Sequence, residues 1–247
     1  GVTPIVSIYS TFLQRGFDQV IHDICIQKLP VVFCLDRSGF AGEDGATHHG
    51  LYDIAFLLPI PNITLLAPKD GQELEDMMGW AIQQKTAVSI RYPKGPIPDR
   101  NGTPFIPTHT KKSEVMLENS PSQPKQFDVC LIAVGPLAWH AYDVAKELEK
   151  EQISVVVINL KWIKPLDKET LIQYITCSKH FIVLEEGCAI GGVYTHLLRT
   201  LSEENIACEL RHCHQIAVPD LFIDHGKIPS LQKKVHLDRD SILKKVK

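Results

Sequence analysis

The stretch DRSGFAGEDGATHHG, residues Asp36 to Gly50, sets four glycines among an arginine, three carboxylates and two adjacent histidines. It follows an apolar run, Leu29 to Leu35, whose length and β-branched residues predict a buried parallel strand. In open α/β sheets, ligands bind at the loops that leave the carboxyl ends of such strands. Glycines let the backbone approach a ligand, and cations, carboxylates and imidazoles can bind phosphate and transfer protons. The stretch therefore predicts an α/β fold with a functional loop, and a solvated surface loop is the alternative.

Length and composition are those of a globular protein with a sizeable core. The chain has 247 residues, an apolar content of 44% and a formal net charge of -3. Basic and acidic residues are interspersed, so neither a nucleic-acid partner nor a membrane surface is expected. No signal peptide or membrane-spanning run is visible. We expect a cytoplasmic protein, or one of a plastid-type organelle in a eukaryote.

Seven cysteines are scattered along the chain without a CxxC pair. Their odd number and apolar surroundings predict buried, reduced thiols. Cys208, His212 and His214 could be taken for a zinc cluster, but they fall in an expected strand. No metal ligands are therefore predicted in this chain.

Apolar periodicity and turn residues predict alternating strands and helices in the first half of the chain. The strand Ile5 to Tyr9 precedes a helix that begins near Ser10 or Thr11 and covers FLQRGFDQVIHDICIQK. The later elements are the strand 29–35, a short helix in LYDIAFLLPIP, the strand 63–67, a helix 72–83 capped by Asp70, and the strand 87–92. This order is typical of a parallel sheet with helices on its faces.

Aromatic and basic side chains gather at the expected carboxyl ends of these strands. Tyr9, Phe12 and Arg15 surround the start of the first helix, where free amides and an aromatic wall can receive a planar polar ring. The simpler alternative is that both aromatic residues belong to the core. Arg91 lies at the end of the strand 87–92 and adds a second cation to the edge that carries the glycine-rich loop.

The composition changes between Pro93 and Pro124, where proline, glycine, serine and threonine are too dense for long regular structure. A short strand at Glu114 to Leu117 is the exception. We interpret residues 99–127 as a linker between a first domain, residues 1–98, and a second domain, residues 128–247.

A second series of strands and helices begins at Asp128. Strands at 129–134, 154–160, 180–185 and 208–212 alternate with helices at 137–151, 168–176 and 193–204. Each half is thus predicted to be an α/β unit with a doubly wound parallel sheet. Glu185 and Glu186 precede GCAIGG, a turn that could take an anion, although packing or an interface is the favoured use. The last residues, SLQKKVHLDRDSILKKVK, predict a basic pair of surface helices.

Several longer strings are specific enough to indicate a family. IYSTFLQRGFDQVIHD, QKLPVVFCLDRSGFAGEDGATHHG, IRYPKG, KPLD, EEGCAIGG and VPDLFIDHG closely resemble the 1-deoxy-D-xylulose-5-phosphate synthases. These are thiamine diphosphate enzymes of the transketolase superfamily. The resemblance covers nearly the whole chain except the linker. It implies a pyrimidine-binding domain from Ile5 to about Pro93 and a transketolase-type C-terminal domain from Asp128 onward.

The resemblance also implies roles for aromatic and basic residues. Tyr9 and Phe12 lie in the wall around the aminopyrimidine of the cofactor, and Arg15 lies beside them at the active site. Arg37 and Arg91 look like the pair that binds the phosphate of glyceraldehyde 3-phosphate. Two fork-shaped cations suit that task because they can make several charge-assisted hydrogen bonds to a dianion.

Two polar residues of the glycine-rich loop, Asp44 and His48, match residues that face the substrate in this family. His48 is the better candidate for proton transfer, because histidine titrates near neutral pH. His49 stands where the family more often has glutamine, which implies a secondary polar contact or a neutral substitution. The implied reaction condenses pyruvate with D-glyceraldehyde 3-phosphate to 1-deoxy-D-xylulose 5-phosphate and carbon dioxide, a step toward isoprenoids, thiamine and pyridoxal.

Other parts of the family pattern have no counterpart in these residues. The Mg²⁺ ligands and the diphosphate-binding segment belong to an N-terminal domain, and the glutamate that activates the cofactor is expected just before Gly1. The abrupt start on a strand also indicates part of a longer protein. We therefore expect a fragment that is inactive alone, and a homodimer or a complex with an N-terminal fragment.

Two other interpretations remain. A beta subunit of a 2-oxo acid dehydrogenase naturally consists of these two domains, and a partner alpha-type chain would favour it. A non-catalytic assembly module would keep the fold without the chemistry. It would be favoured if the candidate side chains pointed away from a common cleft.

Overall fold

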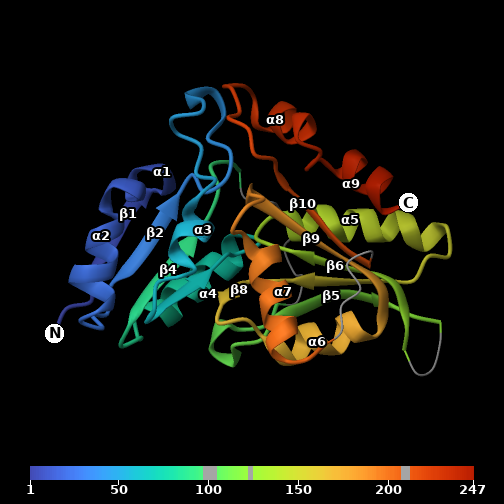
Figure 1. The fold of residues 1–247 in the computed structure, drawn as a ribbon, viewed down its shortest axis with the longest axis horizontal. Helices are drawn as coiled ribbons and strands as arrows, with labels where there is room; N and C mark the ends of the chain where they lie inside the picture. The colour runs from blue at the N-terminus through green and yellow to red at the C-terminus, as the bar shows by residue number, and fades with distance from the viewer. Residues whose placement is uncertain (97–104, 122–124, 207–211) are drawn as a thin grey trace.

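The computed structural model describes residues 1–96, 105–121, 125–206 and 212–247, which form two α/β halves side by side (Figure 1). Each half is built around a five-stranded sheet of mostly parallel strands with helices on both faces. The N-terminus and the C-terminus lie at opposite ends of the molecule (Figure 1). The α/β prediction for both halves is confirmed.

The first sheet has the strand order β1-β2-β4-β3-β8. Its parallel strands are β1 (Ile5–Tyr9), β2 (Val32–Asp36), β3 (Ile63–Leu66) and β4 (Ala87–Arg91). The edge strand β8 (Trp162–Lys164) is antiparallel to β3 and comes from the second half of the chain. β8 was not predicted, because three residues carry too little periodicity to identify a strand from the sequence.

The helix expected after Tyr9 is not regular. It is divided into α1 (Ser10–Leu13), η1 (Gln14–Gly16), α2 (Phe17–Gln19) and the π-helical turn η2 (Val20–Cys25). Gly16 leaves the helical conformation, with φ -105° and ψ 15°. The prediction of one continuous helix was therefore wrong, because the spacing of apolar residues does not reveal a change of backbone conformation at a glycine.

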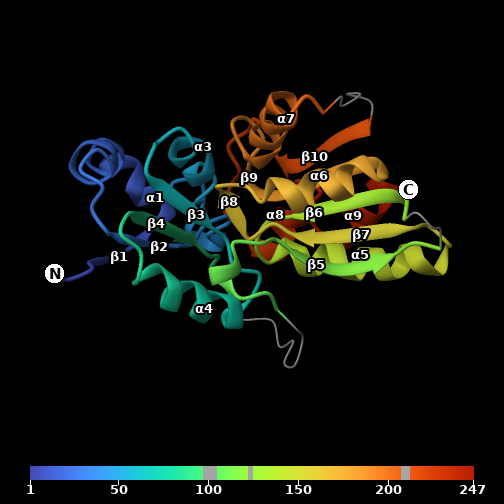
Figure 2. The same cartoon turned by 90° about the horizontal axis from the view of Figure 1, so that it is seen from below.

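The remaining helices of this half are α3 (Asp53–Leu57) and α4 (Gly71–Ala81). α4 covers one face of the sheet, and α1 and α3 lie on the opposite face (Figure 2). The predicted cap of α4 is confirmed, since the Asp70 carboxylate accepts a hydrogen bond from the Glu73 amide at 3.0 Å.

The second sheet has the strand order β10-β9-β6-β7-β5. The strands β6 (Phe127–Ala133), β7 (Val155–Asn159), β9 (Ser178–Cys188) and β10 (Cys213–Val218) are parallel, and β5 (Glu114–Asn119) is antiparallel to β7. Part of the predicted linker is thus an edge strand of this sheet. The last strand was expected at 208–212, but residues 208–211 lie outside the described ranges and β10 begins at Cys213.

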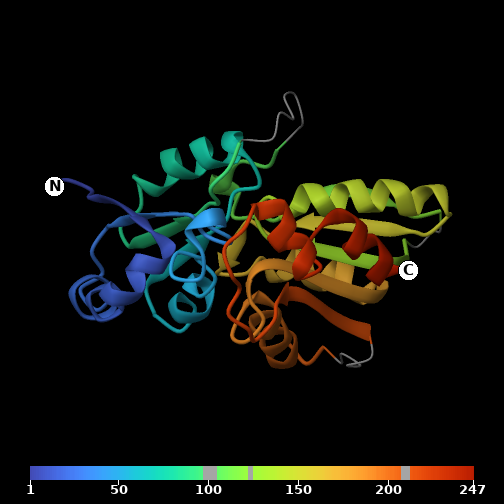
Figure 3. The same ribbon diagram turned by 90° about the horizontal axis from the view of Figure 1, so that it is seen from above.

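Helices cover both faces of the second sheet (Figures 2 and 3). On one face, α5 (Leu137–Lys150) packs with α8 (Ile228–Lys234) and α9 (Arg239–Val246). On the other face lie α6 (Lys168–Thr176) and α7 (Val193–Glu203). The predicted pair of C-terminal helices is confirmed. No helix within the described ranges has the length and apolar character that crossing a membrane requires.

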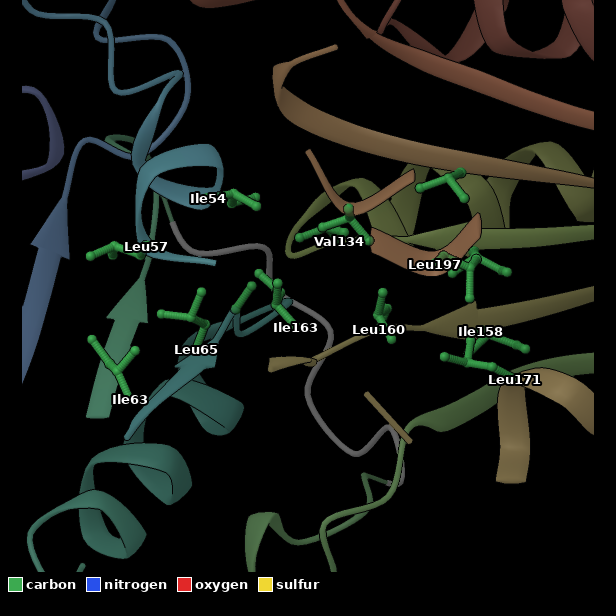
Figure 4. Close-up of a cluster of buried hydrophobic side chains, with 14 of the residues drawn as sticks. Ile54, Leu57, Ile63, Leu65, Val134, Ile158, Leu160, Ile163, Leu171 and Leu197 are labelled. Carbon is green, nitrogen blue, oxygen red and sulfur yellow. The ribbon is translucent and has the colours of Figure 1, made fainter. Parts of the chain in front are cut away.

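One hydrophobic cluster continues from the first half into the second (Figure 4). Ile54, Leu57 and Leu65 of the first half and Ile158 and Leu160 of the second belong to it. The halves therefore share buried apolar surface, which fixes the strand ends of both sheets relative to each other.

The cysteines differ in part from the expectation of reduced thiols. Cys25, Cys34, Cys130, Cys177 and Cys188 are free. Cys213 is disulfide-bonded, so the expectation was wrong for this residue. Burial raises the pKa of the Cys130 thiol, which keeps it protonated and unreactive.

Candidate functional site

Three neighbouring strands of the first sheet end at the candidate site. In the strand register, Tyr9 lies opposite Asp36, and Leu35 lies opposite Arg91. Parallel strands present their carboxyl ends at one edge, so β1, β2 and β4 place these residues together. The glycine-rich loop begins at this edge.

Two aromatic rings form the centre of the site. Tyr9 and Phe12 are stacked, with centroids 5.1 Å apart and planes 7° apart. The His48 ring meets Phe12 edge-on at 5.4 Å. Phe12 is 42% exposed, so this aromatic surface faces solvent rather than the core. The core alternative for Phe12 is therefore contradicted by its exposure, and the ring remains free to stack on a planar group.

Arg37 completes the aromatic cluster. Its guanidinium carbon lies 3.9 Å from the centroid of the Tyr9 ring, within cation–π distance. The same guanidinium pairs with the Asp36 carboxylate, which also accepts the Arg37 amide at 2.7 Å. Arg37 has φ +56°, a left-handed conformation that is uncommon for arginine. The turn thus directs the cation back over the end of β1.

Asp44 and His48 approach this cluster from the loop. The Asp44 carboxylate accepts a hydrogen bond from Lys94 Nζ at 3.1 Å. This hydrogen bond lowers the pKa of Asp44, and the charges of His48 and Arg37 lower that pKa further. His48 Nδ1 lies 2.9 Å from Thr47 Oγ1. Asp44 therefore lies close enough to His48 and Arg37 for their charges to affect its pKa.

Arg91, the second residue predicted to bind phosphate, is paired with groups of this chain. It is buried, and its guanidinium donates to Asp53 at 2.8 and 3.3 Å and to the Glu186 carbonyl at 3.1 Å. Ser38 also donates to Asp53, at 3.1 Å. Among the described contacts, Arg91 shares none with Arg37, and their joint role in phosphate binding stays a prediction.

Arg15 lies in η1 and is exposed. None of the contacts found in the described part of the chain joins its side chain to the aromatic cluster. Its predicted place beside Tyr9 and Phe12 stays a prediction.

His49, expected to be a secondary polar contact or a neutral substitution, makes two polar contacts. It is 2% exposed, and its Nδ1 accepts the Ala41 amide at 3.0 Å. Its Nε2 can then donate to the Asp224 carbonyl, 3.2 Å away. The loop is also joined to the C-terminal half where the Gly226 amide donates to Gly42 O at 3.2 Å, as the adjacent segments in Figures 1 and 3 show. His49 therefore anchors the loop to the second half.

Glu186 makes a second connection between the halves. Its carboxylate accepts the Phe40 amide at 2.8 Å and the Gln232 side chain at 2.6 Å. A Cβ atom on Gly39 would lie 2.3 Å from Glu186 Oε1, and Gly39 has φ +98°. Glycine is thus required here for both conformation and space. The paired glutamates were visible in the sequence, but the partner in the loop was not.

Glu185 binds the amides at the start of α7. It accepts Val193 N at 2.7 Å, Tyr194 N at 3.1 Å and Gln215 Nε2 at 2.8 Å. Burial raises the pKa of Glu185, and these hydrogen bonds oppose the rise. The GCAIGG turn therefore already holds a carboxylate of this chain, in line with the packing use favoured for it.

A cavity of about 620 Å³ lies between the two halves and is lined by residues of both. Residues after β2 and β4 line it on one side, and the β6–α5 turn with Glu186 lines it on the other. Arg91, Lys94 and Asp36 are among its lining residues. Domain interfaces and strand carboxyl ends are common places for small-molecule sites.

The cluster fits the aromatic end of a thiamine-type cofactor better than its diphosphate end. An exposed, stacked aromatic surface beside a histidine can hold a planar heterocycle. Within the described residues, no group of three or more His, Cys, Asp or Glu side chains could hold a metal ion. These residues can therefore contact the ring, but they provide no metal site for a diphosphate.

Comparison with known proteins places both halves in recognised domain families. Residues 1–99 match the transketolase pyrimidine binding domain, and residues 121–242 match the transketolase C-terminal domain. The chain is 39% identical to the 1-deoxy-D-xylulose-5-phosphate synthase of Clostridium tetani and 40% identical to that of Clostridium acetobutylicum. Both alignments cover 100% of this chain and 38% of the relative. The chain thus spans well under half the length of these relatives.

Solved structures share the fold. A structure described as a split gene transketolase, inactive beta4 tetramer, has a TM-score of 0.82 and 25% identity, covering 98% of this chain and 75% of that one. The transketolase of Campylobacter jejuni has a TM-score of 0.76 and 16% identity, covering 98% of this chain and 35% of that one. Both comparisons extend over the two halves together.

Proposed function

Because the chain belongs to the transketolase family, we propose that it is the pyrimidine-binding and C-terminal part of a thiamine diphosphate-dependent transferase. The reaction proposed is the condensation of pyruvate with D-glyceraldehyde 3-phosphate to 1-deoxy-D-xylulose 5-phosphate and carbon dioxide. Identities of 39% and 40% with synthases of that name support it. The observation that carries the proposal is the gathering of Tyr9, Phe12, Arg37, Asp44 and His48 at one sheet edge.

Tyr9 and Phe12 are proposed to hold the aminopyrimidine ring. Their stacked arrangement and the exposure of Phe12 support this role, because a planar ring can extend the stack. When bound, thiamine diphosphate supplies the carbanion chemistry that pyruvate decarboxylation requires. Mg²⁺ and the diphosphate are proposed to bind to residues outside this chain.

Arg37 and Arg91 are proposed to bind the substrate phosphate. Arg37 lies over Tyr9, and Arg91 lines the cavity between the halves. A phosphate at the mouth of this cavity would lie near the carboxyl ends of both β2 and β4. Arg91 would act there while remaining paired with Asp53.

His48 is proposed to transfer protons to and from the substrate. Thr47 lies at hydrogen-bond distance from Nδ1, which leaves Nε2 as the nitrogen facing a reacting group. Asp44 remains ionised near neutral pH, because its hydrogen bond to Lys94 lowers its pKa. Arg15 is proposed to lie at the same site, where it would add positive charge.

The chain is proposed to be inactive alone and to work in the cytoplasm as a homodimer, together with an N-terminal domain. The similar split gene transketolase structure is described as an inactive beta4 tetramer, which supports an assembly that lacks activity without other parts. The alternative is that the chain is a beta subunit of a 2-oxo acid dehydrogenase, whose partner would be an alpha-type chain.

The test is to assay the chain alone and with a separately produced N-terminal domain from the Clostridium tetani relative. Pyruvate, D-glyceraldehyde 3-phosphate, thiamine diphosphate and Mg²⁺ are supplied, and 1-deoxy-D-xylulose 5-phosphate is measured. We expect product only from the mixture. In the mixture, His48→Asn should lower the rate about 100-fold or more, since general acid–base catalysis contributes about 10²–10⁴. Turnover by the chain alone, or no product from any mixture, would contradict the proposal.

A further inference from the structure

Lys94 lies three residues beyond the end of β4, between Asp44 and the cavity. Its Nζ is 3.1 Å from Asp44 Oδ2 and 3.5 Å from the Ala41 carbonyl. Its side chain is among those that line the cavity. Lys94 therefore contacts Asp44 of the glycine-rich loop and also borders the cavity proposed to receive the substrate.

The two arginines at this edge are less free to take a new partner. Arg91 is bound to a carboxylate that is 1% exposed, and removing the cation would leave that carboxylate unpaired in the interior. Arg37 is held by Asp36 and by the Tyr9 ring. Arg91 is thus fixed in place by the first residue of α3, and Arg37 by residues of β1 and β2.

The Lys94–Asp44 pair is open to solvent at both ends. The side chains are 43% and 41% exposed, and the nitrogen–oxygen distance is 3.1 Å. Exposed ion pairs contribute little to stability, so this pair can be exchanged at low cost. Lysine is also a flexible cation that binds phosphate as a point charge.

We propose that Lys94 is a further substrate-binding residue that exchanges Asp44 for the phosphate of the aldehyde substrate at the mouth of the cavity. The inference rests on the proposed function and deepens it. Arg37 approaches the same mouth through Asp36, which is also a lining residue. Phosphate binding would release Asp44 from Lys94 and leave its carboxylate to His48, so substrate binding and the proton-transfer pair would be linked.

The first experiment measures binding of inorganic phosphate and of D-glyceraldehyde 3-phosphate to this chain by calorimetry and ³¹P NMR. Lys94→Gln should weaken both affinities about tenfold, equivalent to about 1.4 kcal/mol. Lys94→Arg should stay within about threefold of the unsubstituted chain, because the charge is kept. Lys146→Gln is the matched control, since Lys146 also forms an exposed pair, with Glu149 at 2.9 Å. Thermal unfolding verifies that each variant is folded.

A second arm separates this inference from the function. In the reconstituted mixture, Lys94→Gln should raise KM for D-glyceraldehyde 3-phosphate about tenfold and leave KM for unphosphorylated D-glyceraldehyde unchanged. If no mixture makes product but phosphate binding still depends on Lys94, the function fails and the binding site stands. If the unsubstituted chain binds no phosphate, or if the Gln variants at 94 and 146 bind it equally, the inference is overturned.

Discussion

Arg91 and Asp53 form a buried ion pair beside the cavity, with side-chain exposures of 8% and 1%. The Ser38 hydroxyl also donates to Asp53, so three chain segments meet at one carboxylate. A buried pair of this kind adds little net stability, but removing one partner leaves an uncompensated charge. The pair therefore joins the end of β4 to the start of α3.

Arg91→Ala is expected to lower the free energy of unfolding by about 3–5 kcal/mol, the cost of leaving a buried carboxylate without its cation. Urea denaturation at pH 7 measures it. The control Lys146→Ala breaks an exposed pair and should change the free energy by less than about 1 kcal/mol. A loss below about 1 kcal/mol for Arg91→Ala would show that Asp53 is not held by this arginine.

Asp128 provides a pH-dependent contribution to stability. The Lys179 ammonium and the Ser154 backbone and side-chain donors lower the pKa of Asp128 from 3.8 to about 2. A lowered carboxyl pKa stabilises the fold above pH 4, and this contribution is lost as the pH falls toward 2. Because the side chain is 35% exposed, we expect about 1–2 kcal/mol at pH 7 after solvent screening.

Asp128→Asn tests this contribution by urea denaturation at several pH values between 7 and 3. The variant should be less stable than the unsubstituted chain at pH 7, and the difference should shrink as the pH falls below 4. Glu75→Gln, at an exposed position of α4, is the control. A difference that does not depend on pH would mean that Asp128 acts through packing rather than charge.

Helices and strands that are long enough to show a regular pattern of apolar residues could be predicted from the sequence. The helix expected at 168–176 is α6, and the cap predicted for α4 at Asp70 is present. β8 was not predictable, because a three-residue strand is defined by its pairing with β3 in the other half. The interruption at Gly16 depends on a backbone conformation that glycine permits but does not require.

The candidate site was also predictable only in part. Residues at strand ends could be identified from the sequence strings, because a strand end fixes which edge they occupy. Their partners could not, since Arg91 binds Asp53 at a separation of 38 residues and His49 reaches Asp224 at a separation of 175 residues. Such contacts depend on how two sheets pack, which no local pattern reports.

The Asp70 cap gives a prediction for one helix. Asp70→Ala should lower the free energy of unfolding by about 1 kcal/mol, because the Glu73 amide at the start of α4 loses its acceptor. Urea denaturation measures the change, and Asp70→Asn should recover most of it because asparagine also caps helices. Glu75→Ala, an exposed position on the same helix, is the control. Equal stability of Asp70→Ala and Glu75→Ala would contradict the capping role.

At the scale of the whole molecule, buried charges join the two halves as well as apolar residues do. Lys69 Nζ lies 2.7 Å from Glu114 Oε2 and 3.1 Å from Glu73 Oε1. Asn159 donates to Glu73 at 2.9 Å. Since α4 belongs to the first half and β5 and β7 to the second, the network fixes their orientation. The cavity and the proposed phosphate site depend on that orientation.

A group of apolar side chains on the surface has no cover within the described part of the chain. Ile190, Leu221 and Phe222 are 67%, 66% and 83% exposed, and Tyr52 is 38% exposed. They border a groove of about 340 Å³ that is formed by residues of both halves. Exposed apolar patches of this kind mark protein interfaces. We expect this patch, Tyr52, Ile190, Leu221 and Phe222, to lie in the proposed homodimer interface.

Phe222→Asp is therefore expected to weaken self-association at least about 30-fold, or about 2 kcal/mol, as the loss of a central aromatic residue does in other interfaces. Sedimentation velocity over a concentration series measures the dissociation constant. Ile26→Asp is the control, because Ile26 is 64% exposed and lies outside the patch, so its substitution should leave association unchanged. Circular dichroism verifies that both variants are folded. If both variants associate like the unsubstituted chain, the interface lies elsewhere. If the unsubstituted chain is a monomer at every concentration, this chain does not form the proposed homodimer without its N-terminal domain.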